Sequence, residues 1–181
     1  HGQTIYAKGT FTRPSGTGNQ IIDTGTGIEG KALILFWTYQ TSTGYSESAG
    51  HKIIGYGLAT SSTARGCVPI SAQSIVTTTN AGKRYYENRC MVVFSDSTPT
   101  VESEADFVSF GTGTDVGKFT INWVVNPGVA SAIIIHYTYI GGSDILNAVV
   151  KTLTGPTATG NQAFTGIGFQ GDLLQILSYN Q

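Results

Sequence analysis

Charged residues are scarce in this chain. They make up 12% of its 181 residues, which is about half the share found in an average soluble protein. The formal net charge is −1, and Lys and Arg are scattered apart from Lys83, Arg84 and Arg89. Because nucleic-acid binding needs a concentrated basic surface, the composition argues against nucleic acid as a partner.

Long apolar runs and a targeting segment are missing as well. No stretch approaches the roughly 18 consecutive apolar residues of a membrane-spanning helix, and no basic segment followed by an apolar one opens the chain. We therefore expect no insertion into a membrane. The first residue is His1 rather than Met, which indicates a processed or excised chain.

Cysteine is limited to Cys67 and Cys90, which lie 23 residues apart. A disulfide between them would close a mid-sized loop and contribute about 3 kcal/mol to stability. Two buried thiols would instead behave as small apolar side chains. Two cysteines do not make the dense disulfide framework of small secreted folds, so the sequence leaves both alternatives open.

Glycine, threonine and serine take the place of the missing charges. The chain has 24 Gly, few runs of helix-forming residues, and a turn signal about every ten residues. This composition predicts an all-β fold, either a β-sandwich or a jelly roll. A chain of 181 residues is long enough for one buried core and too short for two, so residues 1–181 are predicted to form a single all-β domain.

An internal repeat joins the two ends of the chain. Residues 10–37 match residues 152–178 at an offset of 142 residues, which becomes 141 beyond Asp23. The identical pairs include Thr12 with Thr154, Pro14 with Pro156, Gly18 with Gly160, Asn19 with Asn161, Gln20 with Gln162, Gly25 with Gly166, Gly27 with Gly168, Gly30 with Gly171, and Leu33 with Leu174. We predict that the two copies supply matching strand pairs to one core.

Alternation of apolar and polar residues predicts most of the strands. They are expected over residues 3–12, 19–22, 51–59, 74–79, 89–94, 102–110, 118–125 and 133–139. Residues 32–37 are apolar at every position, which is typical of a strand buried on both faces. Turn residues predict hairpins at 80–82 and 126–128, and Trp123, Ile133 and Ile135 are predicted core residues.

Both copies of the repeat contain the spacing G-x-G-x-x-G, as Gly25, Gly27 and Gly30 in the first copy. In a dinucleotide-binding fold these glycines follow a strand and open a helix. Here an apolar strand follows them, so we interpret the motif as a turn with glycines at positive φ.

Three carboxylates, Glu102, Glu104 and Asp106, alternate along one predicted strand. Neighbours on one face of a strand lie about 7 Å apart, so a jelly-roll glycoside hydrolase is one hypothesis, because such enzymes use a pair of carboxylates. The favoured alternative is a solvated edge strand whose charges prevent unwanted pairing.

Two other hypotheses concern ligands. His1, with His51 or His136, could form the copper brace of lytic polysaccharide monooxygenases, which the chain resembles only in His1-Gly2 and its β-rich composition. A structural role is favoured for His136, which lies in an apolar strand. Exposed tyrosines could stack on sugars in a carbohydrate-binding module; the candidates are Tyr45, Tyr56, Tyr85 and Tyr86.

Motifs of the common enzyme classes are absent from the sequence. It contains no C-x-x-C pair, H-E-x-x-H helix, P-loop lysine or G-x-S-x-G turn. We therefore predict a protein that is not an enzyme and that has no cofactor and no metal site.

The sequence around the second copy of the repeat carries a resemblance. Residues 159–162 (Thr-Gly-Asn-Gln), 166–172 (Gly-Ile-Gly-Phe-Gln-Gly-Asp) and 141–144 (Gly-Gly-Ser-Asp) resemble uncharacterised β-rich domains of tailed-bacteriophage structural proteins, and the likeness extends from about residue 32 to the end. The resemblance implies a virion role, as a capsid decoration, fibre or tail component. It brings no catalytic residues.

We expect the chain to be a repeating subunit that contacts copies of itself and other structural proteins, in a virion or outside the cell. An extracellular filament subunit that assembles by strand addition is the alternative. Residues 2–11 alternate like a strand and carry few charges, so they could add to the sheet of a neighbouring subunit, with Ile5, Ala7 and Phe11 as the assembly face. Pairing of this strand within its own sheet is the equal alternative.

Overall fold

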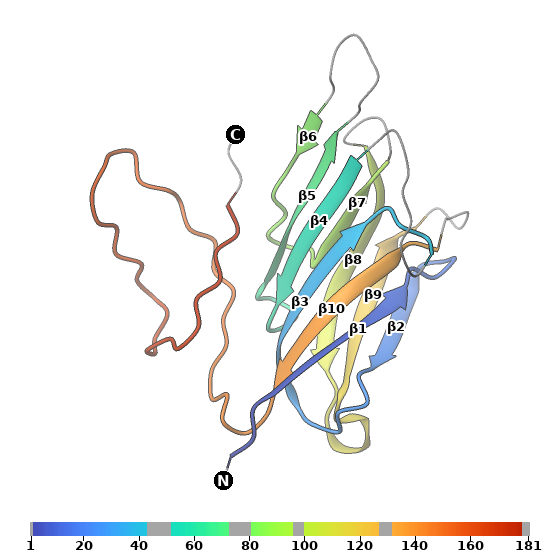
Figure 1. The fold of residues 1–181 in the computed structure, drawn as a ribbon, viewed down its shortest axis with the longest axis horizontal. Helices are drawn as coiled ribbons and strands as arrows, with labels where there is room; N and C mark the ends of the chain where they lie inside the picture. The colour runs from blue at the N-terminus through green and yellow to red at the C-terminus, as the bar shows by residue number, and fades with distance from the viewer. Residues whose placement is uncertain (1, 43–51, 73–80, 96–99, 127–131, 179–181) are drawn as a thin grey trace.

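A computed structural model of the chain describes residues 2–42, 52–72, 81–95, 100–126 and 132–178, and these ranges contain two antiparallel sheets that pack face to face (Figure 1). The six-stranded sheet has the order β1 (Ile5–Thr12), β10 (Ile134–Gly141), β3 (Gly30–Thr38), β4 (Lys52–Ala59), β5 (Arg65–Ala72) and β6 (Ala81–Lys83). The four-stranded sheet has the order β2 (Gly18–Asp23), β9 (Lys118–Val125), β8 (Val101–Phe110) and β7 (Met91–Phe94). The predicted all-β sandwich is confirmed.

Helical structure in the described ranges is limited to one short 3-10 turn, η1 (Gly113–Asp115). Within the same ranges no helix is long and apolar enough to cross a membrane.

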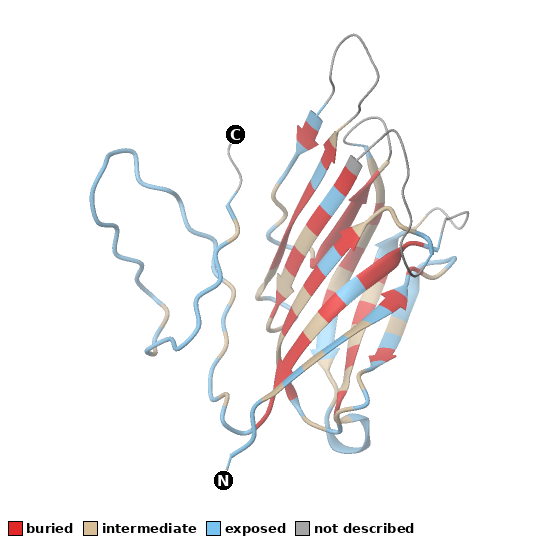
Figure 2. Ribbon diagram, in the orientation of Figure 1, coloured by how far each residue is buried: buried red, intermediate tan, exposed pale blue. Residues whose placement is uncertain are grey.

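The core lies between the two sheets and is rich in aromatic rings. Phe119 of β9 packs against Phe11, Tyr137 and Tyr139 of the six-stranded sheet, with ring-centroid distances of 6.0, 5.3 and 6.3 Å. The predicted core residues are confirmed, because Trp123, Ile133 and Ile135 are at most 1% exposed. Figure 2 shows the resulting alternation of buried and exposed positions along the strands.

Strand β3 is buried on one face only, so the prediction of burial on both faces is wrong. Leu33, Leu35 and Trp37 point into the core and are fully buried, whereas Phe36 is 40% exposed. The physical reason is that the four-stranded sheet covers only the inner face of the six-stranded sheet. The apolar side chains of β3 at the other parity therefore face outward.

Two predicted hairpins are wrong. Ala81 and Gly82 were expected in a turn, but they belong to β6 and pair with Ala72 and Ser71 of β5. Strands β9 and β10 were expected to pair, but they lie in different sheets. The predicted strand over residues 74–79 lies outside the described residues.

Strand β5 is absent from the predicted strands because it contains Gly66 and Pro69, which usually interrupt strands. It lies between β4 and β6 and pairs with β4 over eight residues. The carbonyl of Pro69 still accepts a hydrogen bond from the amide of Arg84 at 3.3 Å. The apolar residues on either side of Pro69 keep the register with β4, in which Val68 pairs with Tyr56 and Ile70 with Ile54.

The chain after β10 leaves the sandwich. Residues 142–178, which we call the C-terminal segment, contain no strand, and Figure 1 shows them outside the two sheets, alongside the sandwich. The prediction that both copies of the repeat supply strands to one core is therefore wrong. The first copy contributes the end of β1, all of β2 and most of β3, whereas Leu174 and Ile176 of the second copy are 67% and 62% exposed.

Both cysteines are buried free thiols. Cys67 and Cys90 are fully buried, and the thiol of Cys90 contacts the carbonyl of Ala105 at 3.3 Å. Burial raises the pKa of Cys67 well above the usual 9.0 and the pKa of Cys90 to about 12. Since the thiolate is the reactive form, both side chains are protected twice, by inaccessibility and by protonation.

We expect the folded protein to leave both thiols unreacted with a thiol reagent at pH 8 and to expose two reactive thiols in denaturant. Because folding raises these pKa values, their contribution to stability is complete below about pH 9 and is lost as the pH rises toward 12. A titration with the reagent, with and without denaturant, checks the first point. Rapid reaction of either thiol under native conditions would contradict it.

Candidate functional site

The three alternating carboxylates lie on β8, which is an interior strand. It pairs with β7 on one side and β9 on the other. The interpretation of Glu102, Glu104 and Asp106 as the charges of a solvated edge strand is therefore wrong. The spacing did predict their common face, because Ser103, Ala105 and Phe107 between them are buried.

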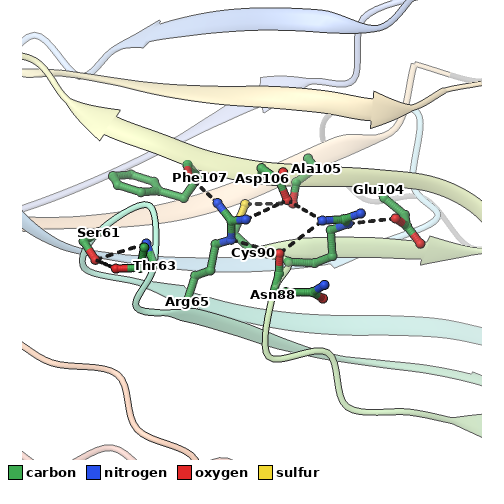
Figure 3. Close-up of polar contacts among 10 residues, drawn as sticks. Ser61, Thr63, Arg65, Asn88, Cys90, Glu104, Ala105, Asp106 and Phe107 are labelled. Atoms are coloured by element: carbon green, nitrogen blue, oxygen red, sulfur yellow. Dashed lines mark hydrogen bonds and ion pairs between the residues drawn. The ribbon is translucent and has the colours of Figure 1, made fainter.

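Each carboxylate is held by arginine. Arg13 contacts Glu102 at 2.6 Å, Arg89 contacts both Glu104 at 2.7 Å and Asp106 at 3.0 Å, and Arg65 contacts Asp106 at 3.3 Å. Figure 3 shows Arg65 between Asp106 and the carbonyl of Phe107, to which it donates at 2.8 Å.

These arginines come from other parts of the chain and tie them to β8. Arg65 begins β5 of the opposite sheet and also donates to the carbonyl of Asn88 at 2.9 Å. Arg13, which follows β1, is only 3% exposed. The Tyr39 hydroxyl donates to Glu102 at 2.6 Å, and burial, together with that carboxylate, raises the pKa of Tyr39. These ion pairs and hydrogen bonds form a charge-compensated network that joins the two sheets. A role in stabilising the fold explains the network.

The outer face of the six-stranded sheet is the more exposed candidate for a functional surface. The register aligns Thr10, His136, Phe36, Tyr56 and Val68 in one row across five strands. A neighbouring row contains Ile54 and Ile70, which are 47% and 43% exposed. We call the exposed apolar side chains Phe36, Ile54 and Ile70, with Tyr56 between them, the outer apolar face.

A shallow hollow of about 440 Å³ lies beside this face, across β1, β10 and β3. Side chains that point outward from these three strands line the hollow, among them Lys8 and Thr10 of β1 and Ile34 of β3. The rings of His136 and Phe36 border it at a centroid distance of 6.3 Å. His136 lies within a strand, β10, as expected, and its side chain is exposed on the outer face.

The predicted ligand residues are dispersed. His1, His51 and Tyr45 lie outside the described residues, and the described ranges contain no group of three His, Cys, Asp or Glu side chains that could hold a metal ion. Two of the candidate sugar-stacking tyrosines contact the C-terminal segment. The Tyr56 hydroxyl accepts a hydrogen bond from Gln175, and the Tyr85 hydroxyl bonds to that of Thr152 at 2.5 Å.

The glycine motif is a turn, as its sequence context indicated. Gly25 and Gly27 have φ values of 70° and 61°, which only glycine adopts readily. The amide of Gly25 donates to the Asp23 carboxylate at 2.8 Å, and strand β3 follows directly.

The predicted assembly face of the N-terminal strand points inward. Ile5, Ala7 and Phe11 share the core-facing side of β1, and Phe11 is only 9% exposed. The strand pairs with β10 of its own sheet from Ile5 to Thr12, so the structure shows the alternative of pairing within the sheet. The opposite edge of β1 has no partner strand among the described residues.

Sequence reasoning missed the outer apolar face, although one signal was present. In residues 32–37 both parities are apolar, and one parity suffices for the core of a sandwich. The second parity, which includes Ile34 and Phe36, forms part of the outer face.

Comparison of the chain with protein-family models, with curated proteins and with solved structures gave no match.

Proposed function

We propose that the chain is a non-enzymatic structural subunit of a larger assembly and that the outer apolar face packs against another subunit. The observation that supports this most directly is the exposure of Phe36, Ile54 and Ile70 on adjacent strands of one sheet. Contiguous exposed apolar side chains are characteristic of interaction surfaces. Lys8 on β1 and Lys83 on β6 flank the face at the two edges of the sheet, as the polar rim of an interface would.

A virion of a tailed bacteriophage is the most specific assembly within this proposal, with a capsid decoration, fibre or tail component as the role. Its support is the sequence resemblance of residues 141–144 and 159–172 described above. An extracellular filament is the second candidate, and the long edge strand β1 favours it, since such an edge accepts an added strand.

Carbohydrate chemistry has weaker support. A glycosidase needs one carboxylic acid and one carboxylate free to act on the substrate, whereas Glu102, Glu104 and Asp106 are each paired with arginine. A binding module would use exposed aromatic side chains, and the hollow beside Phe36 and His136 is where a sugar would fit. A glycan array that gives no saturable signal would remove this alternative.

The proposal predicts that Phe36→Lys combined with Ile54→Lys weakens self-association of the full chain by at least about a hundredfold. Burial of each such side chain at an interface is worth about 1.5 to 3 kcal/mol, and every 1.4 kcal/mol is about tenfold in affinity. Sedimentation velocity and light scattering measure the association, and electron microscopy of the native material shows whether a lattice, ring or filament is formed.

The matched control is Ile21→Lys on β2. Ile21 is 65% exposed but lies on the four-stranded sheet, so its substitution is expected to leave association unchanged. Circular dichroism establishes that all variants keep the fold. A chain that remains monomeric at high concentration and forms no ordered particle in its native source would contradict the proposal.

A further inference from the structure

The second copy of the repeat keeps the backbone geometry of the first, although it lies outside the sandwich. Gly18 and Gly160 have φ values of 116° and 138°. The next two matched glycines agree as well, with φ values of 70° and 61° for Gly25 and Gly27 and of 79° and 81° for Gly166 and Gly168. Left-handed backbone at three matched positions indicates that the same turns are encoded twice.

A side-chain hydrogen bond within the first copy is also reproduced in the second. The Gln20 side-chain amide donates to the carbonyl of Thr12 at 2.9 Å, and the Gln162 amide donates to the carbonyl of Thr154 at 2.9 Å. In the sandwich, the amide oxygen of Gln20 also accepts a hydrogen bond from the indole of Trp123 at 2.9 Å. The bond within the repeat thus orients a glutamine that the first copy uses to contact β9.

The second copy carries apolar residues at the positions that face the core in the first copy. Phe11, Ile22, Leu33 and Leu35 are at most 9% exposed. Their counterparts in the second copy are exposed: Leu153 by 43%, Phe164 by 39%, Leu174 by 67% and Ile176 by 62%. Trp37 is the exception, because Ser178 takes its place.

The sandwich of the same chain has no place for these side chains. Strand β3 fills the position between β10 and β4, and β2 fills the position next to β9. Both belong to the first copy, so the matched residues of the second copy require another set of strands equivalent to β4–β10. Without such strands, nothing explains why the second copy has exposed apolar residues in the pattern of a central strand.

We propose that residues 152–178 form a docking segment for a second β-sandwich of this chain's own type, in which they supply the end of β1, β2 and β3. Its partner is a framework of strands equivalent to β4–β10 that lacks its own β1, β2 and β3, because in the folded chain these three strands already occupy the framework. The inference rests on the proposed function, because it specifies how one sandwich of the assembly is joined to the next. Consecutive sandwiches would then be linked in series through residues 142–151.

The test extends the full chain by residues 41–142 of its own sequence, added after Gln181, since Gln181 matches Gln40 in the repeat. The docking segment and the added strands are expected to form a second cooperatively folded unit. The strand signal in circular dichroism should about double, and amide hydrogens of residues 173–177 should become protected from exchange.

Two neighbouring leucines provide the matched controls. Leu174 corresponds to the core residue Leu33, whereas Leu173 corresponds to Ala32 at the other parity of β3, and their exposed fractions are similar at 67% and 69%. In the extended chain, Leu174→Asp is expected to abolish the second unit and Leu173→Asp to preserve it. Equal effects of the two substitutions would overturn the proposal, because the effect would then not depend on which of the two leucines matches a core position.

A further control replaces residues 152–178 of the extended chain with residues 10–37. If the added strands stay unfolded in the extended chain that carries residues 152–178, the proposal is overturned. The result is most direct if the added strands fold in the control that carries residues 10–37 instead. Docking on the chain's own sheet is the rival outcome. In that case Tyr56→Phe, which removes the hydroxyl that Gln175 contacts, would lower the protection of the segment in the 181-residue chain, and the added strands would stay unfolded.

The two proposals fail separately. An extended chain that forms the second unit but shows no self-association contradicts the assembly proposal and supports the docking segment. An unextended chain that assembles through the outer apolar face, but whose extended form has only one folded unit, supports the assembly and overturns the docking segment.

Discussion

Substitution Glu102→Ala is expected to lower the free energy of unfolding by about 3 kcal/mol, because it removes the carboxylate that compensates a buried guanidinium. The Arg13 side chain has no exposed surface, and its 2.6 Å contact to Glu102 is the closest of the ion pairs on β8. The same guanidinium contacts the Ser103 hydroxyl at 3.1 Å, which is a neutral group and cannot replace a charge. Urea denaturation at pH 7 measures the effect.

The matched control for this prediction is Glu104→Ala, two residues along the same strand. Its partner Arg89 is 24% exposed and keeps the 3.0 Å contact with Asp106, so the expected loss is only about 1 kcal/mol. High salt should change the contribution of Glu104 more than that of Glu102, since buried pairs are screened less. Equal losses in the two variants would show that burial of Arg13 does not determine the cost.

Substitution Gly57→Ala is expected to destabilise the fold by about 3 kcal/mol. A Cβ at this position of β4 would collide with the backbone carbonyl oxygen of Cys90, which belongs to the opposite layer of the sandwich. That carbonyl cannot rotate away as a side chain would, because it is part of the backbone that leads into β7, where the next residue, Met91, pairs with Ala105 of β8. Relief therefore requires the two sheets to separate locally.

The control for this second prediction is Gly16→Ala. A Cβ at Gly16 meets nothing within 4 Å, so the change should stay within about 0.5 kcal/mol of the parent. Thermal and urea unfolding of both variants provide the comparison. Equal stability of the two variants would mean that the close approach of Gly57 to Cys90 imposes no constraint.

Local patterns predicted the elements whose residues alternate without interruption. β1, β2, β4, β8 and β9 follow from alternation, as do the core positions of Trp123 and Ile135. Strand β5 could not be predicted in this way, because Gly66 and Pro69 have the local signature of a turn. The sequences of β9 and β10 do not indicate that the two strands lie in different sheets. Apolar and polar residues alternate in the same way whether two consecutive strands form a hairpin or belong to different sheets.

The candidate surfaces were harder to predict than the fold. The spacing of Glu102, Glu104 and Asp106 places them on one face, but their ion pairs involve Arg13 and Arg65, which are distant in the sequence. The outer apolar face likewise depends on the order β3, β4 and β5 in the sheet. Long-range pairing determines both features, and a single sequence contains no direct record of it.

The position of β10 between β1 and β3 has a consequence for the order of folding. The sheet pairs Ile5 with Gly141, and Gly30 with Gly141 as well, so the first and third strands cannot be bridged before the tenth has been synthesised. Such non-local pairing slows folding, because chain entropy is lost before the contacts form. A nascent chain that has not reached Gly141 leaves β1 without its partner strand β10 and keeps one edge of β3 open, and unpaired edges of this kind promote aggregation. We therefore expect kinetic competition during synthesis, in addition to the final stability, to determine the yield of folded protein.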